Sequence, residues 1–468
     1  MKVGIGIDFG TSNSAAALFD GETLRAVALD AAATPGGDVM PTALYLDRKL
    51  AATVGQPAID RYIRDNVGRK VTLRREEVGD VSITVADTDN TRAANSDGIS
   101  LYARVHAYTD QEQPGRLFRG VKRWLGNTKL EAVRVFAHRF RLVSLVTPVL
   151  AYLERAIRPS RTDGTAVYVG RPVHYEGGAR RADDAATERM REACGHAGLG
   201  NGPLWLEPIA ATLSYLHGQR DAQKRIVLTY DFGGGTLDLS LIRARGESLE
   251  VLATHGLGLG GDEINRMLYR AKVFPELGAG LRYHVPLVSE RKRVSFPFER
   301  FEARLLNWPM AYELNRPDLR ETIVQAMRES PDARRRLGRL LELITRNRAY
   351  AVVQAIESAK LELSSRLHAH IREDDLDLDS PVSREELERL LEPSLDAVDR
   401  AIESLLASAS VRAASVDVVV RTGGSSSVPA VIRRLEQRFP RRVVEHDRFT
   451  SIAAGLAIAS FRGLTQGQ

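Results

Sequence analysis

Two apolar segments near the middle of the chain are separated by a glycine-rich turn. Residues 227–232 read Val-Leu-Thr-Tyr-Asp-Phe, residues 237–242 read Leu-Asp-Leu-Ser-Leu-Ile, and Gly-Gly-Gly-Thr lies between them. Two apolar runs joined in this way predict a β-hairpin. Because the three glycines carry no Cβ, their backbone N–H groups can close around an anion such as a phosphate. Asp231, Thr236 and Asp238 suit a hydrated Mg²⁺ beside that anion. A glycine-rich surface hairpin is the alternative interpretation.

The start of the chain repeats this pattern. An apolar strand is expected over 3–9, a turn with hydroxyl side chains over 10–13, and a second apolar strand over 14–19. Both segments contain Asp-Phe-Gly at the end of the first strand. This internal similarity predicts duplicated halves, each of which offers one phosphate loop to a shared cleft. The glycines of the first strand loosely mimic a dinucleotide-binding motif, but no helix begins after Gly10, and the Lys-Ser/Thr ending of a P-loop is absent.

The rest of the pattern predicts helices and strands that alternate along the chain. Helices are expected over 140–156, 183–196, 383–408, 430–439 and 451–461, and strands over 166–170 and 416–420. One long helix is expected from about 334 to 365, because its apolar residues recur at helical spacing. Glu207 and Pro208 predict a strand-to-helix junction that faces a cleft. Residues 273–318 are expected to be an irregular but ordered insertion, packed by seven aromatic side chains between Phe274 and Tyr312.

Composition narrows the class of protein. The 468 residues are 43% hydrophobic and 27% charged, which is typical of a globular chain with more than one core. No apolar run approaches the roughly 20 residues of a membrane span, and no signal peptide is expected because a strand follows Met1-Lys2 directly. The single cysteine, Cys194, is expected to be a packing group in a cytoplasmic protein. The net charge is +6, but arginine and glutamate are interleaved without a stacking platform, so no nucleic-acid partner is expected.

Taken in order, these motifs resemble the nucleotide-binding domain of the DnaK-type, 70-kilodalton heat-shock chaperones in the actin-like ATPase superfamily. Ile5–Ser14 and Tyr230–Ser240 resemble the two phosphate motifs of that family. Glu207–Leu213 is similar to a connecting motif, and Glu357–Ser365 and Val418–Pro429 are similar to the segments that contact adenosine. Phe118–Gly126 resembles the segment that holds the catalytic lysine, which would be Lys122.

The resemblance implies an α/β, actin-like ATPase (ribonuclease-H-like) fold with two pseudo-symmetric lobes around a nucleotide cleft. The lobes would be residues 1–224, with a β-rich insertion at about 61–115, and residues 225–468, with an insertion at about 266–350. It implies a slow ATPase that uses ATP/ADP and Mg²⁺. The implied catalytic residues are Lys122, Asp8, Asp231 and Thr236. Asp8, Glu207 and Asp231 would hold the metal through water.

The resemblance also implies a set of nucleotide-binding residues. Near the phosphates they would be Gly10, Thr11, Ser12, Asn13, Glu207, Gly233, Gly234, Gly235, Asp238, Gly260, Gly261 and Asp262. Around adenosine they would be Glu357, Lys360, Ser364, Gly423, Gly424, Ser425 and Ser427. The simpler alternatives are that Asp8 and Asp231 are turn-forming acids and that Lys122 is a solvated surface lysine.

The sequence departs from the family pattern in several ways, and two of these departures bear on ligands and partners. Ser427 stands where the family commonly has an arginine against adenine. No substrate-binding domain is expected after the cleft, so the chain looks most like the short, YegD-like branch. We therefore expect a monomeric, chaperone-like ATPase, with unfolded-protein clients or cochaperones implied by the resemblance alone. The alternatives are a small-molecule (sugar-type) kinase, for which no segment clearly provides a catalytic base, and a nucleotide-dependent filament or scaffold protein.

Overall fold

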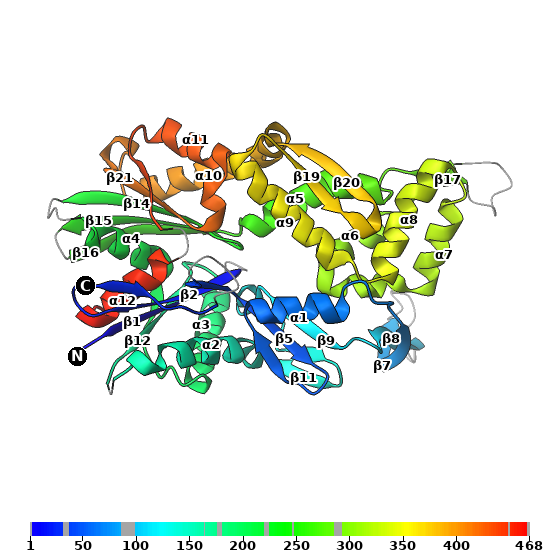
Figure 1. Cartoon of the computed structure of the whole chain (residues 1–468), viewed down its shortest axis with the longest axis horizontal. Coiled ribbons are helices and arrows are strands. Elements are labelled where there is room, and N and C mark those ends of the chain that lie inside the picture. The colour runs from blue at the N-terminus through cyan, green and yellow to red at the C-terminus, as the bar shows by residue number, and fades with distance from the viewer. Residues whose placement is uncertain are drawn as a thin grey trace, which may run out of the picture.

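The structure of the chain is a computed structural model that describes residues 2–30, 37–85, 99–162, 164–175, 180–219, 224–245, 248–284, 293–447 and 450–465. Parts of the two expected insertions, residues 86–98 and 285–292, lie outside the described residues. The described chain has a mixed α/β fold built on two mixed sheets, which confirms the expected fold class (Figure 1).

The first sheet has six strands in the order β13-β12-β1-β2-β3, with β4 paired to β2. In it, β1 is antiparallel to β2 and parallel to β12. These strands are β1 (Gly4–Phe9), β2 (Asn13–Phe19), β3 (Leu24–Ala26), β4 (Val39–Pro41), β12 (Val167–Arg171) and β13 (Leu204–Leu206).

The second sheet has five strands in the order β16-β15-β14-β21-β22, and it repeats the arrangement of the first. Its central strand β14 is antiparallel to β15 and parallel to β21. The strands are β14 (Arg225–Phe232), β15 (Leu237–Arg245), β16 (Ser248–Leu257), β21 (Val418–Thr422) and β22 (Val443–Glu445). Both predicted hairpins are therefore confirmed, and they occupy equivalent places in two similar sheets.

Smaller sheets surround these two. A three-stranded sheet contains β6 (Ala52–Val54), β5 (Ala43–Asp47) and β9 (Gly115–Arg119). The antiparallel pairs are β7 (Leu73–Val85) with β8 (Ile99–Asp110), β10 (Ala132–Val135) with β11 (His138–Arg141), β17 (Arg282–His284) with β18 (Arg293–Ser295), and β19 (His368–Glu373) with β20 (Leu378–Ser383).

Helix α12 (Ser451–Arg462) crosses β1 at very short range, beside α4 (Glu207–His217) (Figure 1). A Cβ on Gly4 would lie 2.1 Å from the Ala457 carbonyl oxygen, and a Cβ on Gly6 would lie 2.2 Å from that of Ala453. The α12 residue Gly455 approaches α4 in the same way. The glycines of β1 thus permit close packing of a helix on the sheet, which explains their spacing without a dinucleotide.

The predicted helices are confirmed at several places. The hydrogen bonds at the start of α10 (Arg384–Ser408) explain why this helix begins there. Ser383 accepts a hydrogen bond from the Glu386 backbone N–H (3.1 Å), while the Glu386 carboxylate accepts one from the Ser383 N–H (2.8 Å). Such a capping box satisfies two N–H groups that the helix itself cannot.

The remaining α-helices are α1 (Gln56–Asn66), α2 (Leu142–Ile157), α3 (Arg180–His196), α5 (Gly261–Leu268), α6 (Glu299–Leu306), α7 (Pro317–Ala326), α8 (Pro331–Thr345), α9 (Ala349–Ser365) and α11 (Pro429–Arg438).

Two sequence predictions were wrong. The expected long helix is interrupted between α8 and α9, because Asn347 adopts a left-handed conformation (φ 49°). Its amide donates to the Asn66 carbonyl oxygen at 3.0 Å, so a tertiary contact accompanies the break. Residues 273–284 and 293–318 are not irregular, since they contain α6, the start of α7 and a 3₁₀ helix at Trp308–Asn315. Their aromatic rings do pack together, with Phe274 and Phe298 4.9 Å apart between centroids.

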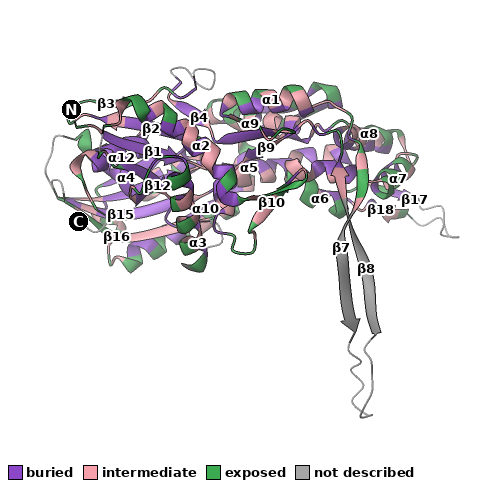
Figure 2. Ribbon diagram, turned by 90° about the horizontal axis from the view of Figure 1, so that it is seen from below, coloured by how far each residue is buried: buried purple, intermediate pink, exposed green. Residues whose placement is uncertain are grey.

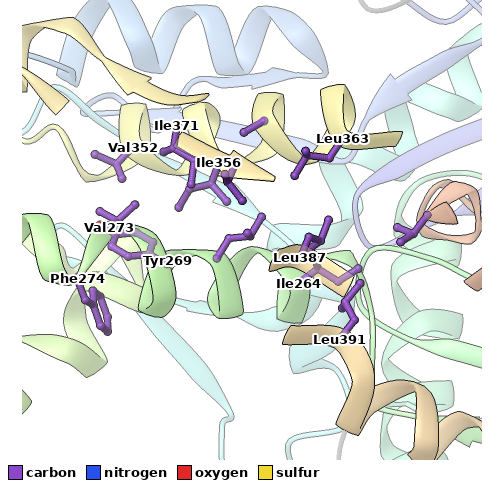
Figure 3. Close-up of a cluster of buried hydrophobic side chains, with 14 of the residues drawn as sticks. Ile264, Tyr269, Val273, Phe274, Val352, Ile356, Leu363, Ile371, Leu387 and Leu391 are labelled. Atoms are coloured by element: carbon purple, nitrogen blue, oxygen red, sulfur yellow. The ribbon is translucent and has the colours of Figure 1, made fainter. Parts of the chain in front are cut away.

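The main hydrophobic core lies in the second half of the chain and joins α5, α9 and α10 (Figure 3). Figure 3 shows Ile264 and Tyr269 facing Ile356 and Leu363. The core of the first half includes Cys194, where burial raises the pKa of the thiol to about 12. That position agrees with a packing role. Figure 2 shows β1, β2 and β12 as buried strands, while α1 and α3 expose their outer faces.

The two halves also meet away from the sheets, where α1 approaches α9. Tyr62, Trp308 and Tyr350 pack ring against ring, with Trp308 and Tyr350 4.6 Å apart and Tyr62 and Tyr350 5.4 Å apart between centroids. We call these three residues the aromatic clasp. Next to it, the Val71 N–H donates to the Thr345 carbonyl oxygen at 2.8 Å. In the described part of the chain, no helix is long and apolar enough to cross a membrane.

Candidate functional site

The loops of the two central hairpins face one cavity of about 410 Å³. The first loop contributes residues 10–13, and the second contributes residues 233–236. A Cβ on Gly234 would lie 1.9 Å from the Ser12 hydroxyl oxygen, so only glycine allows the loops to approach this closely. The sequence repeat therefore brings two backbone-exposing turns together across a cavity, as expected.

The second loop is fastened to the helix and loop beside it. The N–H groups of Gly261 and Asp262, in the first turn of α5, donate to the carbonyl oxygens of Gly233 (3.1 Å) and Gly234 (2.8 Å). The Ser425 hydroxyl, from the loop after β21, donates to the Gly233 carbonyl oxygen at 2.8 Å. These bonds use the carbonyl groups of Gly233 and Gly234. Within the loop, the Gly233 N–H donates to the Thr236 carbonyl oxygen at 2.9 Å.

A buried charge cluster forms one wall of the cavity, with Lys122 at its centre. Lys122 follows β9 in a 3₁₀ turn and is 4% exposed, and its Nζ donates to Glu207 Oε1 at 2.5 Å. Glu207 is the first residue of α4, directly after β13, as the predicted junction required. Asp8 on β1 and Asp231 on β14 line the same cavity and are buried. Lys122 is therefore a buried group, and the surface-lysine alternative is wrong.

The cluster carries more negative than positive charge. Burial and the neighbouring Glu207 raise the pKa of Asp8 to about 7, although Lys122 opposes the shift. Burial, Glu207 and Asp238 likewise raise the pKa of Asp231 well above its ordinary value. Burial opposes the charge on Lys122, but Glu207 and Asp8 outweigh it and raise the pKa of the ammonium group. One lysine thus leaves part of the carboxylate charge uncompensated, which is costly inside a protein.

The excess of carboxylates over ammonium groups in this cluster is relevant to whether the cavity can hold a metal ion. Asp8 Oδ1 is buried and has no hydrogen-bond partner among the described residues. In the same residues no group of three or more His, Cys, Asp or Glu side chains is arranged to hold a metal ion directly. Carboxylates that surround a cavity without converging on one point fit a divalent cation that keeps its water shell.

The opposite wall is formed by α9 and by the loop after β21. Glu357, Lys360 and Ser364 line the cavity from α9, and Gly423, Gly424, Ser425 and Ser427 line it from the loop. Lys360 Nζ donates to the Gly261 carbonyl oxygen at 3.2 Å, and burial lowers the pKa of this ammonium. The Ser427 hydroxyl donates to the Gly424 carbonyl oxygen at 2.8 Å.

Two of the predicted site residues lie behind the cavity wall. Asp238 accepts hydrogen bonds from the Thr236 hydroxyl (2.8 Å) and from the Val173 N–H (3.0 Å), so it supports the second loop without lining the cavity. A Cβ on Gly260 would lie 2.3 Å from the Gly234 carbonyl oxygen, so this glycine lets α5 approach the loop. All other predicted site residues line the cavity.

Several lining residues were not predicted from the sequence. Arg123 forms an ion pair with Asp262 at 2.9 Å, and Arg119 forms one with Glu357 at 3.7 Å, so both arginines join the first half to the second. They flank Lys122 in the sequence, but arginine is frequent throughout this chain and nothing distinguished them. The remaining unpredicted lining residues are Pro172, His174, Tyr175, Leu361, Val428 and Ile452.

Comparison with known proteins agrees with this geometry. A family model described as Hsp70 protein matches residues 165–273 and 340–463. The chain is 24% identical to chaperone protein dnaK3 of Synechococcus elongatus, over 98% of the chain and 50% of that protein. It is 23% identical to chaperone protein dnaK of Cyanophora paradoxa, over 98% of the chain and 60% of that protein. The chain spans about half the length of the curated relatives it matches. The chain is therefore similar to the Hsp70 protein family over these two segments, and to dnaK chaperones over about half of their length.

Proposed function

We propose that the chain binds ATP and ADP with Mg²⁺ and hydrolyses ATP to ADP and phosphate. The observation that carries this proposal is the buried contact of Lys122 with Glu207 between two glycine-rich loops. Phosphoryl transfer needs positioning and charge neutralisation more than covalent help, and this site offers both. Homology to the Hsp70 ATPase domain supports the same activity.

The two loops would bind the phosphates, and the opposite wall would bind adenosine. Backbone N–H groups of residues 10–13 and 234–236, and the hydroxyls of Thr11 and Ser12, can donate to phosphate oxygens. Lys360 and Ser364 on α9 would contact adenosine from one side, and residues 423–427 from the other. The bonds from Gly261 and Ser425 to the second loop would keep it in place when the nucleotide leaves.

Lys122 would hold the attacking water, since its ammonium group can donate to the water oxygen while Glu207 fixes its position. The Thr236 hydroxyl donates its proton to Asp238, so its oxygen is oriented to accept a hydrogen bond from that water.

Asp8, Glu207 and Asp231 would hold Mg²⁺ through water. Such an ion neutralises negative charge on the transferred phosphoryl group. The uncompensated charge of the cluster and the unpartnered Asp8 Oδ1 support this assignment. None of the three residues needs to move to reach the cavity, because all three already line it.

Wider aspects of the proposal rest on family resemblance. We propose a slow, chaperone-like ATPase of the YegD-like branch with lobes at residues 1–224 and 225–468. Unfolded proteins or cochaperones would be its partners, and it would act as a monomer in the cytoplasm. Its single, buried cysteine is compatible with a reducing compartment.

The test is ATP turnover with and without Mg²⁺, compared between wild type and Lys122→Ala. A positioned catalytic group of this kind contributes about 10²–10⁴-fold in rate, so single-turnover hydrolysis should fall by that factor while the Kd for ATP changes by a few fold. Lys49→Ala, which removes an exposed lysine outside the cavity, is the matched control. Wild-type hydrolysis by Lys122→Ala would contradict the proposal. Phosphorylation of a member of a sugar panel would instead indicate a kinase.

A further inference from the structure

A second cavity of about 1070 Å³ adjoins the first on its phosphate side. Thr11, Ser12 and Arg123 line both cavities, so the second opens next to the glycine-rich loops. Trp308 of the aromatic clasp lines its outer end. We call this cavity the second chamber. It is larger than the nucleotide cavity, and its volume is just above the roughly 300–1,000 Å³ range of small-molecule sites.

The wall of the second chamber is strongly basic. Three acidic residues line it, and each is paired with an arginine: Asp262 with Arg123 (2.9 Å), Glu357 with Arg119 (3.7 Å) and Glu263 with Arg266 (3.1 Å). Six cationic residues line it in all, namely Arg119, Arg123, Lys129, Arg181, Arg266 and Arg270.

Two of these cations provide most of the excess charge. Lys129 and Arg181 are exposed, and neither forms an ion pair with any described residue. Both come from the first half of the chain, whereas Arg266 and Arg270 face them from α5 and the turn after it. Arg266 and Arg270 are already paired with Glu263 (3.1 Å) and Glu302 (2.8 Å), so an anion in the chamber would bind to Lys129 and Arg181. Like charges gathered around one cavity raise the local concentration of anions.

Other lining groups suit an organic molecule better than a simple ion. Trp124 and Trp308 offer apolar ring surfaces on the chamber wall. Tyr269 and Asn265 also line it, and the Tyr269 Oη and Asn265 Oδ1 atoms are buried without a hydrogen-bond partner among the described residues. Buried polar atoms of this kind are normally satisfied by a ligand or ordered water. A site with a few polar groups among apolar surfaces is typical of small-molecule binding.

We propose that the second chamber binds a small organic molecule that carries a phosphate or carboxylate group, alongside the nucleotide. Lys129 and Arg181 bind its anionic group, and the tryptophan faces contact its body. A long acidic polypeptide fits this site less well, because Trp308 on the chamber wall packs against Tyr62 of the first half (5.5 Å between centroids) and so joins the two halves there. The inference concerns a second ligand, so it does not depend on hydrolysis of ATP.

The test is calorimetric titration of the full chain with glucose 6-phosphate, citrate and polyglutamate, once in ADP and Mg²⁺ and once without nucleotide. One of the two small anions should bind with a saturable, stoichiometric signal in the presence of ADP. The double variant Lys129→Ala, Arg181→Ala should weaken that binding at least tenfold and leave the Kd for ADP unchanged. The control Lys49→Ala, Arg139→Ala removes two exposed cations that do not line the chamber and should bind as wild type does.

The outcomes separate the two proposals. If the wild type does not bind ADP, the ATPase proposal is contradicted. The titration without nucleotide still tests the second chamber, because it compares the wild type with the Lys129→Ala, Arg181→Ala variant. Small-anion binding that the double variant retains, binding of polyglutamate alone, or no saturable binding of either small anion would each overturn the second-ligand site.

Discussion

The two hairpins that face the cavity have the same frame but differ at one paired position. In the first hairpin, Asp8 on β1 lies opposite Ala15 on β2; in the second, Asp231 on β14 lies opposite Asp238 on β15. Ala15 packs in an apolar cluster beneath α12. Asp238 instead accepts hydrogen bonds from the Thr236 hydroxyl and from the Val173 N–H, which belongs to the segment after β12. The second hairpin is thus tied to the first sheet by a side chain that the first hairpin lacks.

The two hairpin loops also differ in the groups that hold them in place. The first loop is held from within its own half, since the Thr42 N–H donates to the Ser12 carbonyl oxygen at 2.8 Å. The second loop is held by groups from α5, β15 and the loop after β21. Asp238 therefore connects the second hairpin to the first half of the chain through the Val173 N–H. The first hairpin keeps an aspartate whose Oδ1 has no hydrogen-bond partner among the described residues, and this atom is available to a ligand.

The largest expected effect comes from making the hairpins alike. Ala15→Asp would place a further carboxylate at a position that is 1% exposed. An uncompensated buried charge destabilises a protein by about 3–5 kcal/mol, so the free energy of unfolding should fall by that amount at pH 8. Urea denaturation measures it. Ala15→Asn has the same shape without the charge and should be less destabilised. Equal stability of the two variants would show that the position tolerates a charge.

The sequence predicted the frame of the site because its signals are local. Asp-Phe-Gly turns, apolar runs and the Glu207-Pro208 junction depend on neighbouring residues, and the structure brings all of these elements to one cavity. The bond from Asp238 to Val173 N–H joins residues 65 positions apart, and no local pattern encodes it. The break at Asn347 was missed for a similar reason, since its partner Asn66 lies in the other half.

The helices within 273–318 were missed because their stability comes from packing. Helix α6 has only eight residues, and the rings of Phe296, Phe298 and Phe301 contact one another in the folded chain. Arg119 and Arg123 could not be distinguished from other arginines until their partners Glu357 and Asp262 were placed. What sequence reasoning lacked was the pairing of distant residues.

A second prediction concerns the pH dependence that Asp238 adds to the second hairpin. Burial and the charge of Glu207 raise the pKa of Asp238 from 3.8 to about 6 in the folded protein. Between about pH 4 and pH 6 the folded chain therefore holds a proton that the unfolded chain has released. The stability from this group is complete below about pH 4 and is lost as pH rises through 6. At about 1.4 kcal/mol per pKa unit, the loss should approach about 3 kcal/mol.

Denaturant titrations of wild type and Asp238→Asn at pH 4.5 and 7.5 test this. The difference in free energy of unfolding between the two pH values should be smaller in the variant, which cannot titrate. Glu22→Gln, at an exposed position, is the control and should keep the wild-type difference. The same pH dependence in Asp238→Asn would assign the effect to other carboxylates of the cluster.

A third prediction tests the feature that the hairpins share. Asp8→Asn and Asp231→Asn should each weaken Mg²⁺-dependent ATP binding about tenfold, since a hydrogen bond to a charged group contributes about 1.5–3 kcal/mol. ATP titrations with Mg²⁺ and with a chelator measure the change. Asp60→Asn, at an exposed position outside the cavity, is the control. If both aspartate variants kept the wild-type Mg²⁺ requirement, the two residues would be turn-forming acids without a role in metal binding.

The smallest expected effect is on ATP affinity, and it concerns the segments that follow β12 and β21, the strands parallel to β1 and β14. After β12 the chain continues with Pro172 and Val173, whereas after β21 it forms the glycine and serine loop that lines the cavity. Ser427 ends this loop with its hydroxyl bonded to Gly424, so it presents no planar group to a base.

An arginine at position 427 could stack on adenine, and cation–π stacking contributes about 0.5–2 kcal/mol. Ser427→Arg should therefore tighten ATP about fivefold, on the order of 1 kcal/mol, and should increase the preference for ATP over GTP. Calorimetry with both nucleotides decides it. The control is Ser427→Lys, which carries the charge without the plane and should gain less. No gain for ATP in Ser427→Arg would mean that another side chain already covers the base, and Lys360, on the facing wall of the cavity, is the first to test.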